Sequence, residues 1–133
     1  MTNETSVNAQ IVLSEGLELG PNVNVPKIVG PTLVLAMPLK ETALSFNVSV
    51  MTHGLDYSIQ HTVRLKVFEG DKTIANIENG LSSIQNFLGG FVFNFGIRNA
   101  IFKSVGVHTI RFYLDEKLLK EQDFWTVYVG PVE

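Results

Sequence analysis

Three segments of this chain alternate apolar and polar residues with a period of two, which is the pattern of a β-strand with one buried face. They are residues 43–52, 59–68 and 106–114. In the third segment Gly106 opens the strand, and His108 is the first side chain on its apolar face. Five shorter β-branched or aromatic runs, bounded by Gly, Pro, Asn or Asp, predict further strands at residues 10–13, 32–37, 72–77, 91–97 and 124–129.

The connections between these runs favour antiparallel pairing. Gly70-Asp71 separates two of the predicted strands and is a pair that tight hairpins use, so residues 59–68 and 72–77 are predicted to form a hairpin. Residues 115–117, Asp-Glu-Lys, are predicted to turn the last segment back along residues 107–114.

Helical spacing is scarce in this sequence. Residues 81–88 carry Leu81, Ile84 and Leu88 before a Gly-Gly pair, and they predict one short helix. Eight or nine short strands without a βαβ rhythm predict an all-β fold. The fold class expected is an antiparallel β-sandwich, immunoglobulin-like or jelly-roll-like, with at most one short helix.

The length of 133 residues is that of one domain, so residues 1–133 are expected to form a single β-sandwich domain. The first part, about residues 1–38, is rich in Pro and Gly. Four prolines lie between residues 20 and 38. Because proline cannot donate to a central ladder, this N-terminal portion is expected to be extended loop and edge strand.

Charge and cysteine content exclude several function classes. Ten Lys and Arg residues against 13 Asp and Glu give a net charge of -3, which offers no electrostatic footprint for nucleic acid or an anionic membrane. No cysteine is present, so disulfides, thiolate nucleophiles and cysteine metal sites are excluded. With no export signal and no long apolar run, we expect a cytoplasmic protein.

The charged residues are unevenly spread. Residues 42–55 contain none, and residues 73–97 contain only Glu78. Such stretches lie either in the middle of the core or on a surface that something else covers. We therefore expect assembly of the protein with itself or with another protein, and the alternative is that the large apolar side chains of the second stretch are simply core. These side chains are Phe87, Leu88, Phe91, Val92, Phe93 and Phe95.

Residues 106–115 read Gly-Val-His-Thr-Ile-Arg-Phe-Tyr-Leu-Asp, with Lys-Leu-Leu at 117–119 and Phe-Trp-Thr-Val-Tyr-Val at 124–129. This pattern, over roughly residues 40–129, resembles the immunoglobulin-like last strands of small bacterial and phage β-sandwich proteins of unknown function. Glu116 departs from it, because the pattern prefers Gly at that place in the hairpin. The resemblance implies a fold and no catalytic residues, and a phage origin would make the protein a virion component.

A metal or acid–base site would have to use His53, His61 or His108, and the sharpest combination joins His53, Asp56 and His61. If residues 43–52 and 59–68 pair with both apolar faces on the core, Val50 opposes His61, and His53 points away. We then expect His61 on the core face with no carboxylate within reach. His108 is expected to close one end of the core through a hydrogen bond to a neighbouring loop. Whether His61 and His108 meet in space stays open.

No motif of a nucleophilic hydrolase, a phosphate-binding loop or a zinc protease is present, so we expect a non-enzymatic protein without cofactor or metal. A histidine-based metal enzyme is the least favoured alternative. The carboxylates near predicted turns are expected to be ordinary solvated charges, and calcium at Asp71, Asp115, Glu116 and Asp123 is the weaker reading.

The aromatic residues support a second class of function, a carbohydrate or small-ligand binding module. Its candidate platform consists of Tyr57, Tyr113, Trp125 and Tyr128. Alternation places Tyr113 away from the core but does not settle the face of Trp125. We expect Trp125 in the core, as in other sandwiches.

Overall fold

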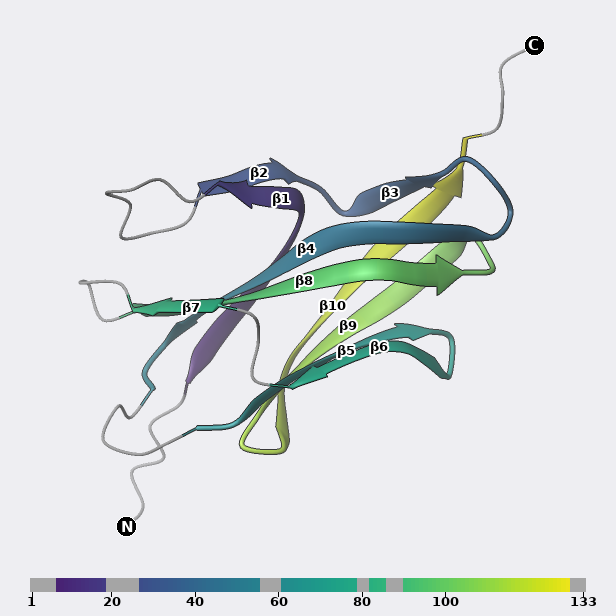
Figure 1. Ribbon diagram of the computed structural model, residues 1–133. Coiled ribbons are helices and arrows are strands. Elements are labelled where there is room, and N and C mark those ends of the chain that lie inside the picture. Colours follow the sequence, from purple (N-terminus) through teal and green to yellow (C-terminus); the bar gives the residue numbers. More distant parts are fainter. Residues whose placement is uncertain (1–6, 19–26, 56–60, 79–81, 86–89, 130–133) are drawn as a thin grey trace.

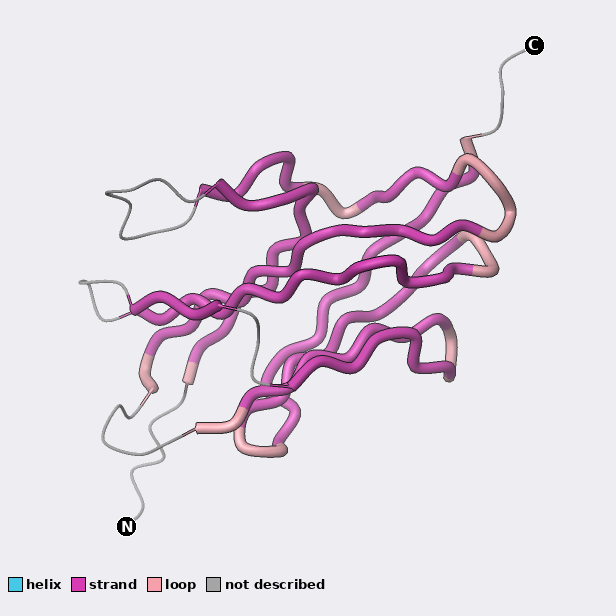
Figure 2. The backbone as a smooth tube through the Cα atoms, viewed as in Figure 1, coloured by secondary structure: helices cyan, strands magenta, loops and turns pink. Residues whose placement is uncertain are grey.

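The computed structural model describes residues 7–18, 27–55, 61–78, 82–85 and 90–129 (Figure 1). Within these ranges the chain forms ten strands and no helix, so the predicted all-β class is confirmed. Figure 2 colours these strands magenta and the connections between them pink. The strands are β1 (Asn8–Glu18), β2 (Lys27–Pro31), β3 (Val34–Met37), β4 (Thr42–His53), β5 (Val63–Glu69), β6 (Lys72–Glu78), β7 (Ser82–Gln85), β8 (Gly90–Phe102), β9 (Gly106–Leu114) and β10 (Lys117–Tyr128). No helix in the described ranges is long and apolar enough to cross a membrane.

The strands form two five-stranded sheets (Figure 1). Sheet A has the order β2-β1-β4-β8-β7, and sheet B has the order β3-β10-β9-β5-β6. Neighbours are antiparallel except β3, which runs parallel to β10 and makes sheet B mixed. The buried apolar side chains of both sheets form one core cluster, an arrangement consistent with a β-sandwich.

Two of the three segments with the clearest alternation became strands close to their predicted bounds, whereas the strand predicted at residues 59–68 begins only at Val63. β9 occupies residues 106–114 as predicted, and β4 extends residues 43–52 by one residue at each end. β5 and β6 form the predicted hairpin around Gly70, and β10 returns along β9 after the predicted turn. β2 and β3, which lie among the prolines, are edge strands, as the prolines predict. The prediction is wrong for β1 of the same N-terminal portion, which lies between β2 and β4 and buries Ile11 and Leu13 in the core.

The predicted helix at residues 81–88 is wrong where the structure describes it. Residues 82–85 form β7, which pairs antiparallel with Phe91–Asn94 of β8, while the other residues of that segment lie outside the described ranges. A helix of eight residues is marginal without tertiary support, and here the edge of β8 offers hydrogen bonds that the short helix cannot match.

The pairing between residues 43–52 and 59–68 that was assumed in placing His61 does not form. β4 lies between β1 and β8 in sheet A, and β5 lies between β9 and β6 in sheet B. Val50 is in register with Ile11 and Phe93 rather than with His61. Each strand buries one apolar face whether the two strands pair or belong to facing sheets, so alternation alone could not distinguish these arrangements.

The first uncharged stretch and the part of the second that belongs to β8 lie in the middle of sheet A, whereas residues 73–78 belong to β6 at the edge of sheet B. The core faces of β4 and β8 bury Phe46, Val48 and Phe95 almost completely. At the centre of these strands the outward face is buried as well, because Ser49 and Asn94 are at most 2% exposed, and the Ser49 hydroxyl donates to Asn94 Oδ1 at 2.9 Å. A charge on either face would have to be desolvated, which explains its absence.

Candidate functional site

His61 lies next to a carboxylate, contrary to the expectation. Its Nδ1 is 2.7 Å from Asp115 Oδ2, and the two residues are 54 positions apart in the sequence. Asp115 Oδ1 also accepts a hydrogen bond from the backbone N–H of Thr62 at 2.9 Å, and the Asp115 N–H donates to the Thr62 carbonyl at 2.8 Å. The hydrogen bonds from His61 and from the Thr62 N–H lower the pKa of Asp115 below its ordinary value. The contacts join the entry of β5 to the β9–β10 turn.

His108 has the role that the sequence predicts for it. The imidazole is 2% exposed, and its Nε2 lies 2.8 Å from the hydroxyl of Thr126 on β10. That hydroxyl donates in turn to the Ser104 carbonyl in the β8–β9 turn, at 3.2 Å. The rings of Phe102 and Phe124 enclose the imidazole, and this burial lowers the pKa of His108. His108 therefore closes one end of the core through a neighbouring turn.

The histidines do not combine into one site. His61 contacts Asp115 just beyond the end of β9, whereas His108 is the third residue of that strand, so the two lie at opposite ends of β9. His53 is an exposed residue at the end of β4, and Asp56 lies outside the described residues. In the part of the chain that the structure describes, no group of three His, Asp or Glu side chains is placed to hold a metal ion.

Trp125 is on the surface, and the expectation of a core tryptophan is wrong. Phe124 and Thr126 are the buried residues of this part of β10, and Trp125 is 43% exposed. Tyr113 faces away from the core as predicted, but its strand position is six residues from Val107, which is the register partner of Trp125. The two aromatic rings are therefore ~20 Å apart along β9 and share no groove. Tyr57 lies outside the described residues.

An exposed apolar area surrounds Trp125. The registers Trp125 with Val34, Trp125 with Val107, and Val127 with Ala36 place these side chains on one outward face of sheet B. Val34, Val107 and Val127 are 44–54% exposed. We call this area the tryptophan surface and define it by Val34, Ala36, Val107, Trp125 and Val127.

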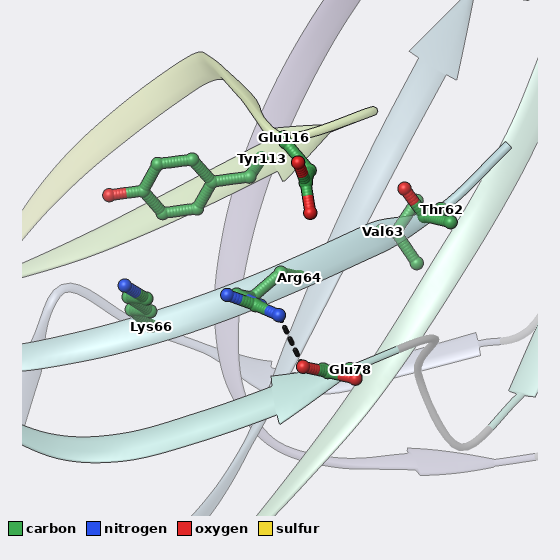
Figure 3. Close-up of a pocket in the computed structure, with 7 residues that line it drawn as sticks. All are labelled: Thr62, Val63, Arg64, Lys66, Glu78, Tyr113 and Glu116. Carbon is green, nitrogen blue, oxygen red and sulfur yellow. Dashed lines mark hydrogen bonds and ion pairs between the residues drawn. The ribbon is translucent and has the colours of Figure 1, made fainter.

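A second feature lies at the other end of the same outward face. It is a pocket of about 260 Å³ over β5, which we call the β5 pocket (Figure 3). It is lined by Thr62, Val63, Arg64, Lys66, Glu78, Tyr113 and Glu116. Arg64 and Glu78 form an ion pair across the β5–β6 hairpin, and the Lys66 ammonium lies 5.4 Å from the centre of the Tyr113 ring. Alternation could have placed Arg64, Lys66 and Tyr113 on outward faces, but not on neighbouring strands.

The phenylalanines that suggested assembly belong to the interior where they are described. Phe93 and Phe95 face the core, Val92 is 6% exposed, and Phe91 packs partly buried against the core. Phe87 and Leu88 lie outside the described residues. Residues 91–95 therefore form no exposed apolar surface.

The sequence matches no protein-family model and no curated protein.

Proposed function

We propose that this protein is a non-enzymatic β-sandwich protein that assembles with a second copy of itself through the tryptophan surface. One observation carries the proposal: Trp125 stands exposed at the centre of a row of exposed valines from three neighbouring strands. Apolar side chains gathered in this way on a sheet face are typical of a surface that another protein covers.

The composition of the tryptophan surface favours a second copy as the partner. Its five residues carry no charge, so two copies can meet there without repulsion between like charges. Trp125 also lies diagonally beside Ala36, the smallest side chain of the area. In a two-fold arrangement the indole of one copy fits over the alanine of the other, which is the self-complementarity that an isologous interface needs.

An immunoglobulin-like or jelly-roll-like sandwich, of the kind found in small bacterial and phage proteins, is part of this proposal. The two sheets with a shared core support it. A phage member of that group would use the same surface within a virion. The cytoplasm is the compartment proposed for a cellular member.

The assembly is tested by gel filtration with light scattering at micromolar concentration. The wild type is expected at about twice the mass of one 14.7 kDa chain, and Trp125→Arg is expected at the mass of one chain, because the arginine would be buried unpaired in the interface. Met51→Arg is the matched control. Met51 is 38% exposed on the outward face of sheet A, away from the tryptophan surface, and this variant should assemble like the wild type.

The fluorescence of Trp125, the one tryptophan of the chain, supplies an independent measurement of assembly. Because Trp125 lies in the proposed interface, its fluorescence should shift to shorter wavelength as the protein concentration rises. A wild type that stays at 14.7 kDa, with an emission spectrum that does not depend on concentration, would overturn the proposal.

A further inference from the structure

Three cationic side chains lie together on the outward face of sheet B. Lys66 of β5 is in register with Arg111 of β9, so the two residues are direct cross-strand neighbours. Arg64 lies two residues before Lys66 and points to the same face. Like charges directly opposite each other on neighbouring strands are destabilising. The repulsion between these cations therefore lowers the stability of the free protein, unless neighbouring negative charges offset it.

The carboxylates near this cluster neutralise its flanks and leave its centre unbalanced. Arg64 pairs with Glu78 on one flank, and Arg111 Nε donates to Glu121 at 2.8 Å on the other. Lys66 lies between the two arginines. Its contact in the described part of the chain is the face of the Tyr113 ring, and no carboxylate there pairs with it. The positive charge at the centre of the cluster thus has no counter-ion within the described protein.

The β5 pocket opens beside this centre. Figure 3 shows the Tyr113 ring and Glu116 on one side of the pocket, and Arg64 with Lys66 on the other. One terminal nitrogen of Arg64 faces Glu78, while the other points away from it, toward the side on which Lys66 lies. The hydroxyl of Thr62 and the carboxylate of Glu116 supply polar groups toward the opposite end.

We propose that the β5 pocket binds a small sugar-like ligand that carries one anionic group, either a phosphate or a carboxylate. The anionic group lies between Lys66 and the second nitrogen of Arg64, where it supplies the missing counter-ion. The hydroxyl groups of the ligand's sugar ring donate to the Glu116 carboxylate and exchange hydrogen bonds with the Thr62 hydroxyl. The C–H face of the sugar ring packs along the ring of Tyr113. This site is at the other end of sheet B from the tryptophan surface and does not depend on assembly.

The ligand class is tested by titrating ¹⁵N-labelled protein with glucose 6-phosphate and, separately, with glucuronate. Saturable shifts are expected at the amides of residues 62–66 and of Tyr113 with at least one anionic sugar, and the stronger binder identifies which anion the site takes. Glucose lacks the anionic group and inorganic phosphate lacks the sugar ring, so each should bind at least tenfold more weakly than the anionic sugar. Added salt should weaken binding because the pocket is open to solvent.

Substitution then assigns the binding to the central cation. Lys66→Met keeps the apolar stem beside Tyr113 and removes the charge, so it should weaken binding by about tenfold or more. Lys66→Arg should restore most of the affinity. Lys72→Met, which removes an exposed lysine from the far end of β6, is the control and should bind like the wild type.

Two results would overturn the inference. One is the absence of saturable shifts at these amides with both anionic sugars. The other is an equal loss of affinity in the Lys66→Met and Lys72→Met proteins, which would indicate a diffuse effect of net charge. Amide spectra of the unliganded variants that match the wild type exclude misfolding as the cause of a lost affinity.

Discussion

The hydrogen bonds around His108 determine the tautomer of its imidazole. The Thr126 hydroxyl donates its proton to the Ser104 carbonyl, so it can only accept from His108. Nε2 therefore carries the proton of the neutral ring. Nδ1, which is buried without a hydrogen-bond partner, is then an unprotonated acceptor. Protonation would place an unpaired N–H and a charge among Phe102 and Phe124, which is why the neutral form is favoured.

The lowered pKa of His108 predicts an acid-sensitive fold. The unfolded chain takes up a proton near the ordinary value of 6.5, whereas the folded protein resists it. The free energy of unfolding should therefore fall as the pH drops through about 6.5, until the folded pKa is passed. In His108→Phe this part of the pH dependence should disappear. Urea unfolding at a series of pH values between 8 and 5 measures it.

Thr126→Val is the control for that experiment. It removes the hydroxyl that His108 contacts but keeps the titrating imidazole buried, so it should lower the stability while keeping the acid dependence. If the free energy of unfolding of His108→Phe falls with pH as steeply as that of the wild type, another group is responsible for the acid sensitivity.

The sequence predicts the role of His108 but not the side chain that contacts His61. The role of His108 could be predicted because strand position alone places it at an end of the core. The neighbour of His61 could not, since Asp115 is 54 positions away and reaches it only because β5 pairs with β9. The prediction that no carboxylate reaches His61 failed because it assumed a pairing between β4 and β5. The His61 side chain itself is largely buried, at 15% exposure.

The turn between β9 and β10 is the element whose residues depart most from those that its backbone conformation normally selects. Asp115 and Glu116 are its two central residues, and both have positive φ, at 51° and 68°. This is the backbone of a two-residue hairpin turn that normally selects Asn or Asp followed by Gly. Asp115 offsets its strain through the bonds to His61 and Thr62, whereas Glu116 forms no comparable bond in the described structure.

Glu116→Gly should therefore stabilise the protein by about 1 kcal/mol, because glycine adopts positive φ without the clash of a Cβ atom. Asp115→Gly relieves the same kind of strain but removes two hydrogen bonds, so it should destabilise the protein. Urea unfolding of the two variants at neutral pH measures both changes. A destabilised Glu116→Gly would mean that the Glu116 side chain contributes more than its backbone strain costs.

Sequence pattern predicted elements well where one face is apolar over many residues. β4 and β9 are of this kind, and their predicted bounds were nearly correct. β1, β8 and β10 are much longer than the runs predicted at 10–13, 91–97 and 124–129, and the strands that were missed altogether or taken for a helix are short. β2, with five residues, and β7, with four, are edge strands whose existence depends on a neighbour rather than on their own periodicity. The tertiary contact, and not local propensity, determines such strands.

At the scale of the molecule, the two lateral sides of the fold are closed differently. On one side the chain passes from β2 in sheet A to β3 in sheet B, and the Leu33 carbonyl there accepts from the Trp125 N–H at 2.8 Å. On the other side β7 covers β8 only as far as Asn94, and an open groove of about 560 Å³ lies between β6 and the rest of β8.

The open side carries features that prevent further strand pairing. Arg98 and Asn99 form a bulge opposite Ser45, Asn99 has a φ of 54°, and the Arg98 guanidinium bonds the Ile97 carbonyl of its own strand. Bulges and cations at a sheet edge disfavour edge-to-edge association. Among the exposed areas of the described structure, the tryptophan surface on the closed side is thus the better candidate for contact between copies.

If two copies assemble there, thermal stability must depend on protein concentration. Binding of a second folded chain stabilises the folded state by mass action, so a higher concentration raises the Tm. For a folding unit of two chains of this size, each tenfold increase should raise the Tm by roughly 3 °C, given the usual unfolding entropy per residue. Calorimetry over a hundredfold range of concentration measures the shift. Trp125→Arg should melt at one temperature throughout that range, whereas Met51→Arg should follow the wild type, and a wild-type Tm independent of concentration would contradict a dimer.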